Sequence, residues 1–147
     1  MQEPARIVHG DYGLHNCLSR QGAVTAVLDW EISTLGDPLA DLAYALNRFA
    51  DPAEGASPDP AAATAPPGFP TRAELAARYA EGSGRGLANL AYYRAFNHWK
   101  SACILQGVYA RYREGKKSHE GVDLGQMAGQ ISTQLSAAEA AAAQAGV

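Results

Sequence analysis

The sequence predicts an α+β fold that is mostly helical and carries one short β-hairpin. Four segments repeat apolar residues with helical period, and most of them begin at a recognisable capping residue. Near the N-terminus, two short runs of β-branched and apolar residues flank a polar turn at Gly22, which is typical of a hairpin. At 147 residues and 47% hydrophobic content, the chain is long enough for one domain with a core and too short for two ordinary domains.

The first elements expected along the chain are a strand over residues 6–9, a loop, and the two hairpin strands over 16–19 and 24–29. Asp37 follows, with a proline directly after it. An aspartate can cap free amides, and proline fits the first position of a helix. We therefore expect a helix over 38–49, where apolar residues recur with helical spacing.

Residues 51–70 hold six prolines and little large apolar surface. Such a segment cannot build a core, so we expect an exposed loop that is either a linker within the domain or a flap over a site. Thr71 and Glu74 then form a capping box, and the helix that they open should end at Gly82. The glycine-rich run over 82–86 follows this helix instead of opening one, which favours a helix stop over a phosphate-binding loop.

The two C-terminal helices are expected to be the longest. Residues 89–114 are apolar nearly all round and end before Gly115, which predicts a central, buried helix with its aromatic residues mostly in the core. These aromatic residues are Tyr92, Tyr93, Phe96 and Trp99, and the alternative for one or two of them is a place in the lining of an acceptor pocket. The last helix should run over 123–143 and fray where the sequence fades into alanine and glutamine.

Charge and hydropathy exclude several classes of function. Twelve basic side chains against 15 acidic ones, with a pI near 5.7, provide no basic field for nucleic acid or for an anionic membrane surface. No apolar run approaches the roughly 20 residues of a membrane span, and residues 1–10 lack a signal-peptide pattern, so we expect a cytoplasmic protein. Cys17 and Cys103 form no CxxC pair and are expected to be reduced and partly buried.

The stretch over residues 7–41 carries the chemistry. A His-Gly-Asp tripeptide at 9–11 is followed by Asn16 with the spacing of the kinase catalytic loop, H-R-D-x-x-x-x-N, except that glycine replaces arginine. In that pattern the aspartate accepts the proton of the substrate hydroxyl and the asparagine holds a metal ion. The hairpin then delivers Asp29, followed by Trp-Glu, where kinases place the metal-binding aspartate of D-F-G. We predict Asp11 as catalytic base, and Asn16 and Asp29 as ligands of a Mg²⁺ ion that binds with ATP.

With HGDxxxxN, DWE and GDPxxDLA in this order, the chain resembles the aminoglycoside phosphotransferase and choline kinase-like family. The resemblance implies a protein-kinase-like C-terminal lobe over 1–147. Residues 1–37 would form its catalytic loop and metal-binding hairpin, 51–70 a loop rich in proline and alanine, and 71–143 a helical subdomain on the substrate side. It also implies mainly structural roles for four residues of the GDPxxDL element: Gly36, Asp37, Pro38 and Asp41.

Two later segments, FPTRAELAARYAEGSG and LQGVYARYREG, look like the branch of this family that is fused to, or encoded near, acyl-CoA dehydrogenases. This finer resemblance implies that the hydroxyl acceptor is a hydroxy acid or a hydroxyacyl-coenzyme A. Residues 85–117 fit a neutral or anionic acceptor, because they hold seven basic side chains and one acidic one, the opposite of what a polycationic aminoglycoside requires. The alternative is that these side chains only solvate helix faces.

In this family an N-terminal lobe with a phosphate-covering loop and a strand lysine precedes the catalytic loop, and only eight residues precede His9 here. We therefore expect half of an ATP-dependent O-phosphotransferase, inactive alone. We expect either that the N-terminal lobe completes the enzyme or that this chain self-associates through an apolar surface beside residues 24–28. The alternative is a non-catalytic half-domain that acts as a binding or interaction module.

Three histidines have expected roles. His9 should be a hydrogen-bonded structural residue. For His15 two interpretations stay open, a structural residue or one that faces the nucleotide, and the structural one is preferred. His98, alone on the long helix, should be packed.

Overall fold

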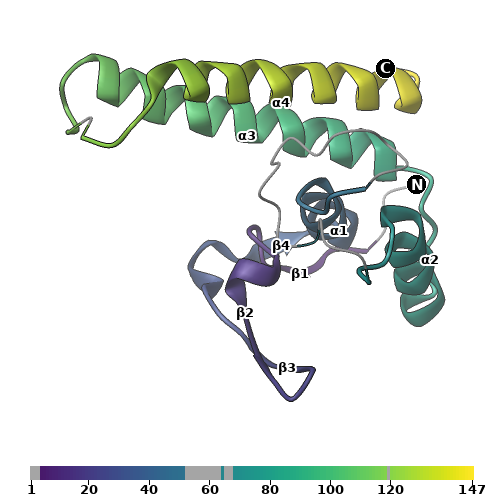
Figure 1. The fold of residues 1–147 in the computed structure, drawn as a ribbon. Helices are drawn as coiled ribbons and strands as arrows, with labels where there is room; N and C mark the ends of the chain where they lie inside the picture. Colours follow the sequence, from purple (N-terminus) through teal and green to yellow (C-terminus); the bar gives the residue numbers. More distant parts are fainter. Residues whose placement is uncertain (1–3, 52–63, 65–67, 119) are drawn as a thin grey trace.

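The computed structural model describes residues 4–51, 64, 68–118 and 120–147, and it has the expected α+β architecture. Within these residues it holds four α-helices and two small antiparallel sheets. The long helices α3 (Leu90–Arg113) and α4 (Leu124–Ala145) lie side by side, α1 (Pro38–Asn47) packs against α3, and α2 (Arg72–Ser83) packs against α1 (Figure 1). The strands lie on the far side of α1 from α4 (Figure 1).

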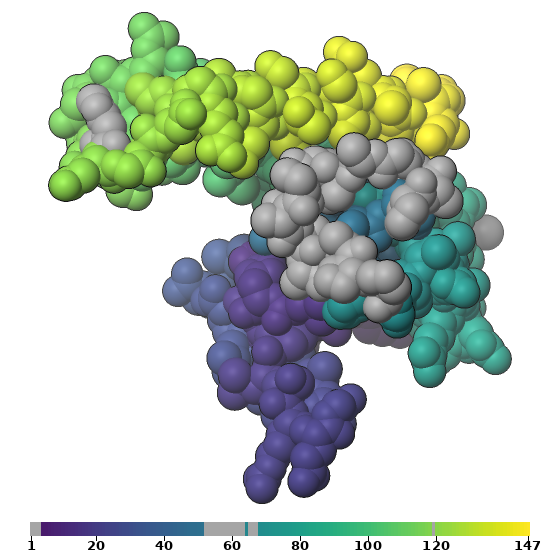
Figure 2. All heavy atoms as spheres, in the orientation of Figure 1, coloured from purple at the N-terminus to yellow at the C-terminus, as the bar shows by residue number. Residues whose placement is uncertain are grey.

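The predicted hairpin is confirmed, with β2 (Cys17–Arg20) pairing antiparallel to β3 (Ala23–Val27). Its turn consists of Gln21 and Gly22, whose φ angles are 53° and 79°. Two successive positive φ values are what a tight two-residue hairpin turn requires, and glycine adopts them without a steric cost. The hairpin projects away from the helical part as a separate arm (Figure 2).

The N-terminal strand is also confirmed, as β1 (Arg6–Val8), and its partner is a strand that the sequence did not predict. This partner, β4 (Thr34–Gly36), pairs antiparallel to β1. Three residues are too few to show an alternating pattern, so β4 had no readable signal. Because β4 leads directly into α1, the pairing sets the start of α1 beside the chain that leads into the His-Gly-Asp tripeptide.

Helix α1 forms for the predicted reason. The Asp37 carboxylate caps it by accepting from the backbone N–H of Leu39 at 2.9 Å, and proline occupies its first turn. Leu39, Ala43 and Leu46 are buried on one face and make the centre of the core. The helix ends at Asn47, two residues before the predicted limit, within the usual uncertainty of helix ends.

Helix α2 opens on the predicted capping box of Thr71 and Glu74, in which each side chain bonds the other residue's backbone. It ends at Ser83, one residue beyond the predicted end at Gly82, and Gly84, with φ of 69°, closes it in the left-handed conformation. Most of the expected loop over 51–70 lies outside the described residues.

Helix α3 departs from the prediction of a helix buried all round. Its buried residues are Ala95, Asn97, His98 and Ala102. The aromatic residues Tyr92, Phe96 and Trp99 are 44–53% exposed, so their assignment to the core was wrong. Helix α3 packs against α1 and α4, and its remaining face is open within the described part of the chain.

Helix α4 runs two residues beyond the predicted end, to Ala145, and Gly146 closes it in the left-handed conformation. His98 is packed as predicted, with its Nδ1 2.8 Å from Gln134 Oε1 of α4. Both cysteines are free; Cys17 is half-buried, but Cys103 is exposed, contrary to expectation. Among the described helices, none is long and apolar enough to cross a bilayer.

Candidate active site

The backbone of the His-Gly-Asp tripeptide is held by a carboxylate of α1. Asp41 accepts hydrogen bonds from the backbone N–H groups of His9 and Gly10, the latter at 2.8 Å. His9 is 2% exposed and structural, as predicted: its Nε2 donates to the carbonyl of Leu28 at 2.7 Å, and its ring lies 4.8 Å from that of Trp30. Helix α1 and the end of β3 thus fix the loop from two sides.

The glycine that replaces the kinase arginine has a steric explanation. Gly10 has φ of 87°, a region that residues with a Cβ rarely adopt. A Cβ built there would lie 3.2 Å from the side chain of Ile32 and 3.3 Å from its carbonyl oxygen. The tight path of the loop past residues 30–32 therefore requires glycine.

Asp11 is the centre of a hydrogen-bond network, and its side chain is 31% exposed. The hydroxyl of Tyr44 donates a short hydrogen bond to Oδ1, while His15 Nε2 and Asn16 Nδ2 lie 3.3 and 3.2 Å from Oδ2. Burial alone would raise the pKa of Asp11, but the hydrogen bonds from Tyr44, His15 and Asn16 outweigh it and hold the pKa below its ordinary value. The carboxylate is therefore ionised at neutral pH, as a proton acceptor must be.

Asn16 lies in the 3₁₀ turn Leu14–Asn16 and is 8% exposed. Its amide nitrogen donates to the Asp11 carbonyl at 2.9 Å as well as to the carboxylate. Both hydrogen bonds use the amide nitrogen. The amide oxygen is therefore available to accept a hydrogen bond or to bind a cation. The carbonyl of Asn16 also accepts from Leu28 N–H at 2.8 Å, and this bond places Asn16 beside the segment that carries Asp29.

Asp29 begins the 3₁₀ turn Trp30–Ile32, two residues after β3. Its φ of 65° and ψ of 50° are left-handed, a conformation that costs energy for a residue with a Cβ and that clusters at functional sites. The carboxylate is exposed and caps no backbone group of this turn. Among the described residues, no group of three or more His, Cys, Asp or Glu side chains could hold a metal ion. Asn16 and Asp29 are therefore two candidate oxygen ligands and not a complete cage.

The GDPxxDL residues have the structural positions that the sequence analysis expected. Gly36 leaves room for Val8, since a Cβ there would lie 3.1 Å from its side chain. Asp37 caps α1 and also accepts from the hydroxyl of Tyr93 at 3.0 Å, tying α1 to α3. Pro38 is in the first turn of α1, and Asp41 anchors the catalytic loop as described above.

His15, for which two interpretations were open, contacts the candidate base, with its side chain 38% exposed. The basic residues of 85–117 do not all lie at the catalytic loop. Lys100 reaches the catalytic loop, donating to the Gly10 carbonyl at 3.1 Å. Arg94 donates to Asn47 Oδ1 of α1 at 3.0 Å. Arg111 and Arg113 lie at least 11 positions beyond Lys100 along α3, or about 16 Å at 1.5 Å per residue. Lys116 pairs with Glu114 at 2.7 Å.

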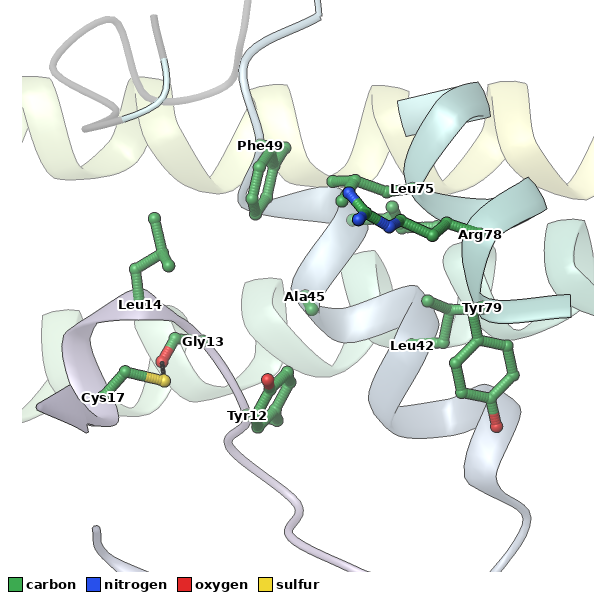
Figure 3. A pocket seen from close by; sticks show the side chains of 11 residues that line it. Tyr12, Gly13, Leu14, Cys17, Leu42, Ala45, Phe49, Leu75, Arg78 and Tyr79 are labelled. Atoms are coloured by element: carbon green, nitrogen blue, oxygen red, sulfur yellow. Dashed lines mark hydrogen bonds between the residues drawn. The ribbon is translucent and has the colours of Figure 1, made fainter. Parts of the chain in front are cut away.

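A cavity of about 380 Å³ lies between the catalytic loop, α1 and α2 (Figure 3). The loop contributes Tyr12 and Leu14, and α2 contributes Leu75 and Tyr79 (Figure 3). The other lining residues are Gly13, Cys17, Leu42, Ala45, Leu46, Phe49 and Arg78. Among these described lining residues Arg78 is the one charged side chain, so the cavity is apolar with a single cation at its wall.

Sequence reasoning missed Tyr44, and it treated Lys100 only as one of several basic residues. A signal for Tyr44 was present, because Asp41 and Tyr44 of α1 and Arg48 at its C-cap recur at helical spacing, opposite the buried leucines of α1. A polar stripe of this kind next to a catalytic motif indicates which helix face meets the loop. No comparable signal placed Lys100, because its partner lies 90 residues away in sequence.

Comparison with known proteins gave consistent matches. A model described as the phosphotransferase enzyme family matches residues 1–94. Acyl-CoA dehydrogenase family member 11 of Gallus gallus is 36% identical over 122 residues, covering 78% of this chain and 16% of that protein. Acyl-CoA dehydrogenase family member 10 of Mus musculus is 37% identical over 125 residues, covering 80% of this chain and 11% of that protein. The chain thus spans less than a fifth of these curated relatives.

One solved structure matches nearly the whole chain. The crystal structure of a "putative aminoglycoside phosphotransferase" from Ralstonia eutropha JMP134 has a TM-score of 0.69 and 31% sequence identity. The match covers 94% of this chain and 45% of that one.

Proposed function

Because this chain belongs to the phosphotransferase enzyme family, we propose that it forms the catalytic lobe of an enzyme that transfers the γ-phosphoryl group of ATP to a hydroxyl of a small molecule. It is related to the corresponding region of acyl-CoA dehydrogenase family members 10 and 11. The observation that supports the proposal best is the contact of the Asn16 amide with the Asp11 carboxylate, together with the backbone bond from Leu28 N–H to the Asn16 carbonyl, which places the segment that carries Asp29 beside Asn16.

Asp11 is the proposed catalytic base. Its carboxylate is ionised, partly exposed and anchored, so it can accept the proton of an acceptor hydroxyl and orient its oxygen toward the γ-phosphorus. Positioning is the main demand of this reaction, because phosphoryl transfer needs in-line geometry and little covalent help. The hydrogen bonds to the Asp11 carboxylate supply such positioning.

Asn16 and Asp29 are the proposed ligands of Mg²⁺, which the family generally uses together with ATP. Mg²⁺ is held in such sites by one or two protein oxygens, with phosphates and water as the other ligands. The amide oxygen of Asn16 and the exposed carboxylate of Asp29 fit this set. When bound, the ion would neutralise phosphate oxygens of the nucleotide.

A neutral or anionic acceptor, such as a hydroxy acid or a hydroxyacyl-coenzyme A, fits the surroundings of the loop. The cavity next to Tyr12 has a volume in the usual range of ligand pockets, and its lining is apolar with Arg78 as its cation. Lys100 adds a second cation at the Gly10 carbonyl. A polycationic acceptor would require carboxylates at these positions.

We propose that the lysine that pairs with the nucleotide phosphates lies in another part of the enzyme. The sequence of residues 1–147 holds three lysines: Lys100, Lys116 and Lys117. None of them lies on a strand, since Lys100 is in α3 and the other two follow it. A polypeptide of residues 1–147 should therefore show no appreciable turnover by itself, and micromolar ATP affinity with turnover would contradict this.

The test is a panel assay of the full-length natural protein with magnesium-ATP. The acceptors would be 3-hydroxybutyrate, 3-hydroxybutyryl-coenzyme A, choline and kanamycin, with phosphorylated product detected by mass spectrometry. We expect product with the hydroxy acid or its thioester. Preferential phosphorylation of kanamycin would refute the acceptor class, and no product with any acceptor, together with no ATP binding, would favour a non-catalytic binding module.

A further inference from the structure

We propose that Tyr44 is a positioning residue for the Asp11 carboxylate. In this arrangement, Lys100 of α3 and Arg48 at the C-cap of α1 hold the phenol ring of Tyr44 in place. The inference rests on the proposed role of Asp11 as catalytic base, and it adds a residue outside the sequence motifs that indicated the site.

The position of Tyr44 on α1 brings it to the loop. Tyr44 lies three residues after Asp41, so the two side chains share one face of the helix. Asp41 accepts from the backbone of His9 and Gly10, and Tyr44 donates to Oδ1 of Asp11. One helix face thus fixes both the backbone of the tripeptide and the side chain of its last residue.

The direction of the hydrogen bond is settled by the chemistry of the phenol. Burial and the hydrogen bond to Asp11 raise the pKa of Tyr44 to about 12, so the hydroxyl keeps its proton at neutral pH. A protonated phenol facing a carboxylate can only donate to it. A hydrogen bond to an ionised acceptor is also stronger and more directional than one between neutral groups.

Two cations restrain the ring of Tyr44. Arg48 donates from Nη1 to the Tyr44 hydroxyl oxygen at 3.2 Å, and its guanidinium carbon lies 5.5 Å from the ring centroid. Lys100 Nζ lies 5.2 Å from the same centroid while bonding the Gly10 carbonyl. Both distances are within the range of cation–π attraction. The phenol is therefore held from α1 and α3 together, and Lys100 links it to the loop.

Positioning by Tyr44 has a defined consequence for Asp11. With Oδ1 held by Tyr44 and Oδ2 close to His15 and Asn16, the plane of the carboxylate is fixed. Tyr44 occupies one lone pair of Oδ1, so the acceptor hydroxyl can still donate to the other lone pair of this oxygen. Without the phenol, Oδ1 would lose its hydrogen bond and only the contacts at Oδ2 would resist rotation of the carboxylate. Misplacement of a catalytic group lowers the rate of the chemical step.

The test compares Tyr44→Phe with Tyr93→Phe in the full-length protein. Tyr93 is a matched control, because its hydroxyl also donates to a carboxylate, that of Asp37, but at the N-terminal cap of α1. With magnesium-ATP and the best acceptor of the panel, Tyr44→Phe should lower kcat roughly tenfold to a hundredfold and leave the KM for ATP within about twofold. Tyr93→Phe should change kcat less than about twofold.

Unchanged kcat in Tyr44→Phe, or an equal loss in both variants, would overturn the proposal. A wild-type protein that transfers no phosphoryl group would refute the proposed function and the catalytic part of this inference with it. The contact itself is tested separately by proton NMR of tyrosine-labelled protein. We expect a downfield hydroxyl resonance that disappears in Tyr44→Phe and in Asp11→Ala, and its absence from the wild type would overturn the contact.

Discussion

Removal of the Asp41 carboxylate should damage both the stability and the activity of the protein. Asp41→Ala deletes the acceptor of two backbone hydrogen bonds, from His9 and Gly10. Hydrogen bonds to charged groups contribute about 1.5–3 kcal/mol each, and the half-buried position of Asp41 argues for the lower value. Two such bonds give a loss of about 3 kcal/mol, or a fall in Tm of about 6–12 °C for a domain of this size.

The kcat of Asp41→Ala should fall roughly tenfold or more, because the loop that carries Asp11 loses its anchor. A loss of this size is expected when a catalytic group is misplaced. Differential scanning calorimetry and the phosphotransfer assay would measure the two effects. Asp123→Ala is the matched control, because Asp123 caps α4 by accepting from Gln126 N–H at 3.0 Å. It should cost about 1 kcal/mol without changing kcat. If Asp41→Ala behaved like Asp123→Ala in both assays, the assigned anchor would be wrong.

Three further outcomes follow from the structure. Arg72→Ala should lower the free energy of unfolding by about 3 kcal/mol or more, because it removes a buried guanidinium that donates to the carbonyls of Leu46 and Phe49 at the end of α1. Chemical denaturation measures this loss, and a variant as stable as the wild type would contradict it. Because folding lowers the pKa of Asp11 below its ordinary value of 3.8, its stabilising effect is present above pH 3.8 and lost as the pH falls through the folded value. The unfolding free energy of the wild type should therefore fall more steeply below about pH 4 than that of Asp11→Asn, and parallel curves would count against the network. Finally, Ile7 and Leu35 are cross-strand partners that are 71% and 72% exposed, and such an exposed apolar pair favours association. Sedimentation of the 1–147 polypeptide should therefore reveal self-association that Leu35→Lys weakens. A strict monomer at high concentration would refute this prediction.

Local signals in the sequence predicted most of the fold. Asp37 and its proline predicted the start of α1, the capping box at Thr71 predicted α2, and Gly22 predicted the hairpin turn. Each of these features depends on residues within a few positions of one another. Asp11 and Asn16 were likewise predictable as neighbours, since five residues of loop cannot carry them far apart.

Features that depend on packing between distant segments could not be predicted. Pairing of β1 with β4 joins residues 26 to 30 positions apart. The contacts of Tyr44 with Asp11, and of Lys100 with Gly10, span 33 and 90 positions. The exposed aromatic face of α3 was misjudged because an apolar helix gives no sign of how many neighbours will cover it.

The different roles of Asp11 and Asp29 are the central claim, and calorimetric titration of magnesium-ATP into two variants of the full-length protein tests it most directly. Asp29→Ala should abolish both nucleotide binding and turnover, because it removes the exposed carboxylate proposed to hold the metal. Asp11→Asn should bind magnesium-ATP as the wild type does while turnover falls about a hundredfold or more, the size usual for a lost general base. Equal loss of nucleotide binding in the two variants would contradict the account.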